Sequence, residues 1–194
     1  MNLPALYLMV FSGLSLNLIL QCGLGMRGAA LIKSSDNRLL FIKLGLIFIT
    51  IFLLWGFFSL ISLIFDLGFF EYILLFPASA FVFFSLEYIL FNFILKEKID
   101  NISPINWCDG LAGAALFITL NIAEGFLDAI SLSFGFVTGI FLSFIIISEI
   151  RRRAAMEQVP PFLRGSPLAL ISMGLLSLIF SFAAVMFLRV LGAE

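Results

Sequence analysis

The sequence predicts an all-α integral membrane protein with six transmembrane helices, arranged as two inverted three-helix repeats with broken first and fourth segments. Three observations support this fold class. Hydrophobic residues make up 62% of the 194 residues and charged residues only 12%, which leaves too little polar surface for a soluble globule. The apolar residues form six runs between charged connections, and two similar stretches surround the two cysteines.

The composition also excludes several kinds of chemistry. The chain contains no histidine, so His-ligated zinc, His-ligated haem and catalytic Ser-His pairs are ruled out. Its two cysteines cannot complete the four-thiolate set that an iron–sulfur cluster usually needs, so two further thiolates would have to come from another chain. No basic run indicates a nucleic acid partner, and we expect membrane lipid around the chain.

The first three apolar runs cover 1–26, Leu44–Phe65 and Phe69–Leu95. Each is long enough to cross the hydrocarbon core as a helix, because about 20 apolar residues suffice. The first run ends in Gly23, Gly25 and Gly28. Since glycines weaken a helix, we expect Cys22 to lie at a break.

The last three runs cover Gly110–Ala123, Ala129–Ser148 and Ser166–Leu188. The fourth run is short, so we expect 102–108 to form a half-helix or re-entrant piece that other protein covers. Glu124 and Asp128 close this run. In the fifth run, Gly135 and Gly139 form a small-xxx-small pattern that favours close helix packing.

The positive charges indicate the topology. All but one of the 11 Lys and Arg residues lie at the connections between runs one and two, three and four, and five and six, and Arg189 alone lies on the other side. Connections rich in Lys and Arg stay in the cytoplasm, so we expect both termini outside. The cations at these connections are Arg27, Lys33, Arg38, Lys43, Lys96, Lys98, Arg151, Arg152, Arg153 and Arg164.

We interpret the chain as a single membrane domain, 1–194, with repeat one at about 1–95 and repeat two at about 102–194. Cys22 is followed by Gly-Leu and then Gly-Ala-Ala-Leu, and Cys108 is followed by the same two groups in the same order. Three crossings per repeat would make the second repeat run inverted to the first. The alternative is chance, because these residues are common in packed membrane helices.

Two residues are unusual within the third run. Pro77 lacks a backbone donor, so it kinks a helix or frees a carbonyl. Glu87 is a carboxylate at membrane depth and therefore a candidate for ion or proton coupling. It could instead snorkel, or pair with a basic residue of a neighbouring subunit. Because one carboxylate is a poor cage for a hard cation, we favour a structural or coupling role.

Cys22 and Cys108 are the candidate metal and cofactor ligands. The alternative is that each behaves as an ordinary small hydrophobic residue. Cys108 is the stronger candidate because it lies at the edge of a broken segment, where backbone N–H groups could point at cluster sulfurs. The run Arg151–Arg153 is most simply a topology determinant, and the alternative is a docking surface for a cytoplasmic subunit.

The C-terminal third carries a family resemblance. The Arg-rich stretch leads into Val159–Gly165, which reads Val-Pro-Pro-Phe-Leu-Arg-Gly, and then into an apolar run with Gly174-Leu175-Leu176-Ser177-Leu178. This order resembles the A subunit of the Rnf electron-transport complex and the matching E subunit of the sodium-translocating NADH:quinone reductase. Asn106-Trp107-Cys108 is similar to the family's Asn-Cys, with one residue inserted.

The resemblance implies a membrane subunit of an ion-translocating electron-transport complex in the bacterial inner membrane. In the family, such a subunit pairs with a homologous six-helix subunit of opposite topology. Each contributes two cysteines to one [2Fe-2S] cluster, which passes electrons between flavin- and iron–sulfur-bearing subunits. Here the implied ligands are Cys22 and Cys108.

The first cysteine departs from the family pattern of Asn, several apolar residues and Leu-Gly-x-Cys. Asn17 and Leu24-Gly25 match, but Arg27 occupies the expected cysteine position and Cys22 lies five residues earlier. Five residues correspond to about 7 Å along a helix. Cys22 is therefore a shifted ligand, or the chain is a cofactor-free paralogue that acts as a membrane scaffold or a permease-like transporter of ions or solutes.

Overall fold

The computed structural model describes residues 5–24, 37–64, 69–90, 92, 110–156 and 166–190, and the regular elements in these ranges are all helical. They are α1 (Ala5–Val10), the π-helix η1 (Phe11–Ser15), α2 (Leu18–Cys22), α4 (Asn37–Ile64), α5 (Phe69–Ile89), α6 (Leu111–Ile122), α7 (Phe126–Met156) and α8 (Ser166–Val190). Each element overlaps one of the six predicted runs, and α4, α7 and α8 extend beyond theirs.

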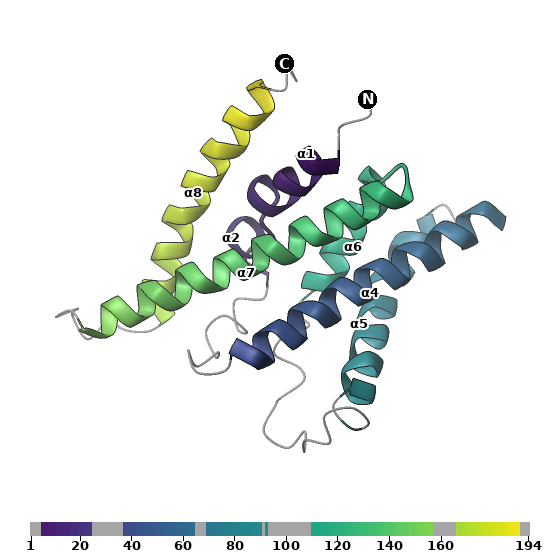
Figure 1. The fold of residues 1–194 in the computed structure, drawn as a ribbon, viewed down its shortest axis with the longest axis horizontal. Helices are drawn as coiled ribbons and strands as arrows, with labels where there is room; N and C mark the ends of the chain where they lie inside the picture. Colours follow the sequence, from purple (N-terminus) through teal and green to yellow (C-terminus); the bar gives the residue numbers. More distant parts are fainter. Residues whose placement is uncertain are drawn as a thin grey trace.

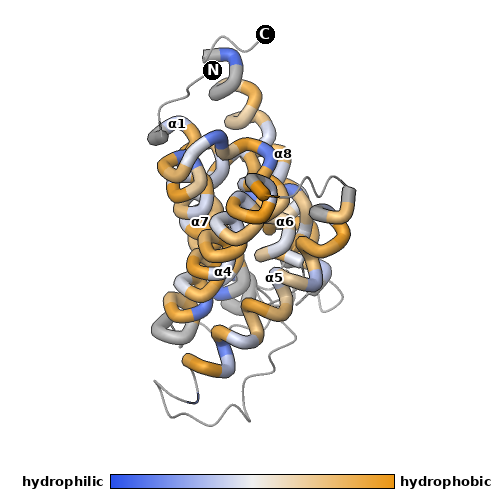
Figure 2. Tube along the Cα trace, turned by 90° about the vertical axis from the view of Figure 1, so that its right-hand side faces the viewer, coloured by the Kyte–Doolittle hydropathy of each residue, from blue (hydrophilic) through white to orange (hydrophobic). Residues whose placement is uncertain are grey.

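Three helices are long and apolar enough to cross a membrane. Among the described residues, the candidate spans are Leu40–Ser62, Tyr72–Ile89 and Phe126–Ile150. The remaining runs form shorter apolar helices at Tyr7–Cys22, Leu111–Ile122 and Leu170–Met186. Most of the tube in Figure 2 has the colour of hydrophobic residues. The structure therefore confirms an all-helical membrane protein.

Helix α7 is the centre of the fold. Its buried residues recur every three or four positions, as a helix that packs along one face requires: Ala129, Leu132, Phe136, Ile140, Phe144 and Ile147. The first segment, α4, α6 and α8 all contact α7. In Figure 1, the first segment (purple) lies between α8 and α7, while α4 and α5 lie on the other side of α7.

The fourth and fifth runs meet in a short turn. Helix α6 ends at Ile122 and α7 begins at Phe126, and the backbone amide of Ala129 donates to Gly125 O at 3.0 Å to close the first turn of α7. Glu124 is exposed in this turn. The structure thus confirms that the fourth run ends here, whereas the predicted half-helix 102–108 lies outside the described residues.

The first apolar run is broken, as predicted, but the main break lies five residues before Cys22. Helix α1 widens into η1, and the helical path stops at Leu16 and Asn17 before α2 begins. The start of α1 and the end of α8 lie at the same end of the molecule (Figures 1 and 2). The chain thus enters and leaves the described fold on one side.

Candidate functional site

The broken first segment packs against α7 almost without intervening side chains. A Cβ atom built on Gly139 would overlap Gly13 O, and one built on Gly135 would overlap Ser12 Oγ. In the other direction, a Cβ on Gly13 would lie 2.9 Å from Gly135 O. These distances are too short for real carbon contacts, so glycine is required at all three positions. The structure confirms the predicted small-xxx-small packing of Gly135 and Gly139.

Asn17 begins the half-helix α2. Its backbone is extended, with φ −64° and ψ 105°, and its Oδ1 accepts from the backbone amides of Ile19 and Leu20, both at 3.2 Å. A helix leaves its first amides without internal partners, and asparagine is among the preferred residues for satisfying them. Asn17 therefore fixes where α2 starts inside the protein.

The same side chain binds α7. Asn17 Nδ2 donates to Gly139 O at 3.0 Å and to Gly13 O at 3.4 Å. Ser143 Oγ lies 3.0 Å from Asn17 Oδ1 and 2.9 Å from Gly139 O, within donating distance of both. Asn17 is 1% exposed, so these bonds replace all contact with solvent. The break in the first segment and the face of α7 form one polar centre.

Cys22 is the last residue of α2 and is exposed. Gly23 follows in the left-handed conformation, with φ 67°, and its amide donates to Ile19 O at 3.1 Å. The amide of Leu24 donates to Leu18 O at 3.2 Å. The bond from Gly23 to Ile19 is that of the αL helix end, which favours glycine at the left-handed position. The thiol therefore lies at a fixed helix end.

The two Cys-containing stretches approach each other. Gly110 precedes α6 and has φ 76°, so the two glycines with positive φ in the described ranges, Gly23 and Gly110, lie one in each stretch. The Leu24 side chain reaches within 3.9 Å of the position that a Cβ on Gly110 would occupy. Cys108, two residues before Gly110, lies outside the described residues, as do Trp107, Asp109 and Arg27.

Within the described ranges, no three Cys, Asp or Glu side chains are placed to hold a metal ion together. Cys22 is the cysteine in this part of the chain, and its thiol is exposed. The exposed thiol fits a shared site, because a ligand to a cluster between chains must be accessible from outside its own chain.

Glu87 is buried in α5, where it is 5% exposed, and pairs with Lys43 of α4. Lys43 Nζ lies 3.3 Å from Glu87 Oε1, and the Lys43 side chain is 0% exposed. The partner is thus in the same chain. This burial and this intrachain pair favour the structural or coupling role over a side chain that snorkels to the interface. Glu87 Oε2 has no hydrogen-bond partner in the described part of the chain.

The position of Lys43 differs from the sequence-based expectation. The charge pattern places it in the basic connection after the first run, but α4 begins at Asn37 and the membrane span at Leu40, so Lys43 lies inside the helix. The run is expected to begin at Leu44 because a cation usually marks the end of an apolar run, and Lys43 precedes Leu44. A cation that faces a buried carboxylate does not follow this rule.

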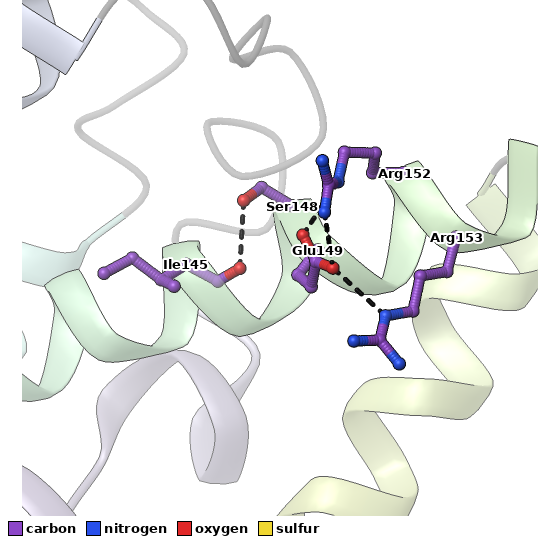
Figure 3. Close-up of polar contacts among 5 residues, drawn as sticks. All are labelled: Ile145, Ser148, Glu149, Arg152 and Arg153. Atoms are coloured by element: carbon purple, nitrogen blue, oxygen red, sulfur yellow. Dashed lines mark hydrogen bonds and ion pairs between the residues drawn. The ribbon is translucent and has the colours of Figure 1, made fainter.

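The Arg-rich end of α7 forms a small exposed network (Figure 3). Glu149 accepts two bonds from Arg152, at 2.9 and 3.0 Å, and one from Arg153 Nε at 3.0 Å. The carboxylate stabilises the charged guanidinium and raises the pKa of Arg152 above its ordinary value. Both arginines remain exposed, which fits either a topology determinant or a docking surface.

Sequence reasoning missed the structural role of three residues: Lys43, Ser143 and Asn17, the last of which entered only as part of a motif. A usable signal existed for each. Lys43 lies close to an otherwise uncharged run, and Asn17 is an amide within the uncharged stretch 1–26. Ser143 continues the four-residue spacing of Gly135 and Gly139, which places all three on one face of a helix.

The fold and these centres define a helical membrane protein with a broken first segment that ends in an exposed cysteine. No protein family model and no solved structure matches the chain. Over 65 residues, about a third of its length, it is 37% identical to the A subunits of the ion-translocating oxidoreductase complexes of Pectobacterium atrosepticum and Pectobacterium carotovorum. It is 38% identical over 66 residues to the corresponding A subunit of Buchnera aphidicola.

These matches span about a third of the length of the curated relatives, 34%, 34% and 32% respectively. They confirm the resemblance to the A subunit of Rnf-type complexes that the C-terminal motifs indicated. The chain is a divergent relative of that protein.

Proposed function

We propose that the chain is a membrane subunit of an Rnf/Nqr-like ion-translocating electron-transport complex in the bacterial inner membrane. The observation that carries the proposal is the similarity to three subunits of ion-translocating oxidoreductase complexes. The apolar helices support a location in the bilayer. The chain is not an enzyme by itself on this proposal. It works with flavin- and iron–sulfur-bearing subunits.

Within the complex, Cys22 and Cys108 supply half of the ligands of a [2Fe-2S] cluster, and a homologous six-helix subunit of opposite topology supplies the other half. The exposed thiol of Cys22 and the approach of Leu24 to Gly110 support this assignment. The cysteine count supports it too, since two thiolates here require two from elsewhere. A bound cluster would carry electrons across the membrane.

The test is the iron content of the purified complex together with the EPR spectrum of the reduced sample. We expect Cys22→Ser and Cys108→Ser each to remove about two iron atoms per complex, the content of one [2Fe-2S] cluster. Ser148→Ala, an exposed position on α7, is the matched control and should keep both. Unchanged iron and an unchanged spectrum in Cys108→Ser would refute the shared cluster.

We further propose the full architecture of six helices in two inverted repeats with both termini outside. The distribution of cations supports it. Cysteines introduced at Glu124 and at Arg152 lie on opposite sides under this topology. A membrane-impermeant maleimide should label Glu124→Cys in intact cells and Arg152→Cys only after permeabilisation. The reverse pattern would invert the topology.

A second candidate function is favoured by the buried Lys43–Glu87 pair and by Arg27 at the expected cysteine position. On this alternative the chain is a cofactor-free scaffold or a permease-like transporter. In either case we assign Glu87 a role in ion or proton coupling, because its Oε2 has no hydrogen-bond partner among the described residues and is free to take a proton or cation. Under the alternative, Cys22→Ser is silent, whereas Glu87→Gln alters the ion dependence of transport in proteoliposomes.

A further inference from the structure

We propose that Asn17 is a positioning residue, which fixes the half-helix α2 against α7 and thereby sets the location and direction of the Cys22 thiol. The consequence for the geometry of a cluster bound by Cys22 rests on the proposed function above. The positioning itself rests only on the hydrogen bonds of Asn17 and on the short distance in sequence between Asn17 and Cys22.

The Asn17 amide uses its full hydrogen-bonding capacity. Both hydrogens of Nδ2 reach carbonyl oxygens, Gly13 O within its own segment and Gly139 O on α7. Its Oδ1 accepts from the first amides of α2 and lies 3.0 Å from Ser143 Oγ. The two ends of an amide are not interchangeable here, because carbonyl oxygens require the NH₂ end and amides require the oxygen. The side chain can therefore adopt one orientation only.

These bonds join three pieces of backbone: the middle of η1, the start of α2 and the middle of α7. No continuous helix connects η1 to α2, since the backbone at Asn17 is extended. The direction of α2 is consequently not inherited from the preceding helix. Apolar contacts of Leu18, Ile19 and Leu20, which are all buried, hold α2 in place but are non-directional. Hydrogen bonds are directional, so they set its angle.

Cys22 lies at the other end of this piece. Helix α2 has five residues, about 7 Å of helix, so the thiol is carried by a short rigid arm attached at Asn17. Its far end is closed by the left-handed Gly23, and the Leu24 side chain then points towards Gly110, 3.9 Å from the position that a Cβ would occupy there. A change of angle at Asn17 therefore moves the thiol directly.

The experiment measures this position without a cluster. In a full-length chain with Cys108→Ser, spin labels are attached to Cys22 and to Leu127→Cys, which is 71% exposed at the start of α7. The distance distribution between the labels is measured by pulsed EPR. Asn17→Asp keeps the size and the cap oxygen but removes the NH₂ donors, so we expect the distribution to widen about twofold.

Two further variants keep the test decisive. Ser143→Ala leaves Asn17 intact and should widen the distribution less, and it carries the test if Asn17→Asp does not fold. Thr50→Val removes a comparable buried hydrogen bond on α4, Thr50 Oγ1 to Leu46 O at 2.7 Å, and should leave the distribution narrow. Distributions as narrow as the parent's in both Asn17→Asp and Ser143→Ala would overturn the proposal.

A second readout separates this inference from the proposed function. In the purified complex with both native cysteines, Asn17→Asp should retain iron but shift the EPR spectrum, because a displaced thiolate changes the geometry at the metal. A widened distance distribution with an unchanged spectrum would support the positioning role of Asn17 and would count against Cys22 as a ligand.

Discussion

The two polar centres inside this protein satisfy their buried groups in different ways. At Asn17, neutral donors and acceptors match one another completely, and the partners come from η1, α2 and α7. At Lys43 and Glu87, two opposite charges meet at 3.3 Å, and one carboxylate oxygen has no hydrogen-bond partner in the described part of the chain. The first centre satisfies its polar atoms fully, whereas the second leaves one carboxylate oxygen without a hydrogen bond among the described residues.

The largest loss of stability is expected from a change at the charged centre of Lys43 and Glu87. Glu87→Gln removes the negative charge beside the buried Lys43 ammonium, and we expect a loss of about 3–5 kcal/mol in the free energy of unfolding. The double variant Lys43→Met with Glu87→Met removes both charges and should recover most of this loss. Unfolding by SDS in mixed micelles provides the measurement. Equal losses in the single and double variants would show that packing, not charge, dominates.

The next largest loss of stability is expected at Gly139, where the backbone of α7 contacts the backbone of the first segment beside Asn17. The Cβ of Gly139→Ala would overlap Gly13 O, so the first segment must shift away from α7, at a cost of about 1–3 kcal/mol. The control is Gly174→Ala on α8, where nothing lies within 4 Å of the new Cβ. It should be neutral or stabilise by about 0.5–1 kcal/mol. The same unfolding assay tests both, and equal effects would contradict the close packing.

A smaller loss of stability tests the hydrogen bonds around Asn17. Ser143→Ala removes one buried hydroxyl that lies within donating distance of Asn17 and Gly139, and we expect a loss of about 1 kcal/mol. Ser148→Ala is a matched control because it removes an exposed serine on the same helix, whose hydroxyl donates to Ile145 O of its own helix at 2.9 Å (Figure 3). If the control loses as much stability as Ser143→Ala, the network around Asn17 contributes nothing specific.

The smallest effect is expected at the exposed charges of α7. Glu149→Gln removes the negative charge that pairs with Arg152 and Arg153, both of which are exposed. Exposed ion pairs contribute little because water screens them. The unfolding midpoint should stay within experimental error of the parent. A clear loss would mean that this network is covered by another protein of the complex, and that would favour the docking interpretation of the Arg-rich stretch.

The existence of the helices could be predicted from the sequence because charged residues separate the apolar runs, although Lys43 lies inside α4 and not at its start. The run Leu44–Phe65 became α4, and Glu124 became the turn between α6 and α7. The packing of Gly135 and Gly139 was predicted as well, because their spacing alone places both on one helix face. Such local patterns need no information about partners.

The two centres could not be predicted in the same way, because each depends on residues that are distant in sequence. Lys43 resembles a loop cation until Glu87 is placed beside it, 44 positions later. Asn17 resembles a helical amide until the carbonyl of Gly139 is known to be close. The break itself was predicted from glycines near Cys22, but it lies at Leu16 and Asn17, because a polar cap satisfied by α7 stops the helix there.

The contact of Gly13 with Gly135 and Gly139 has a mechanical consequence. Where two main chains touch with no side chain between them, neither can slide along the other without first separating. A movement of the first segment relative to α7 therefore requires these main chains to separate first. On the other side of α7, α4 and α5 contact each other through side chains, including the pair of Lys43 and Glu87.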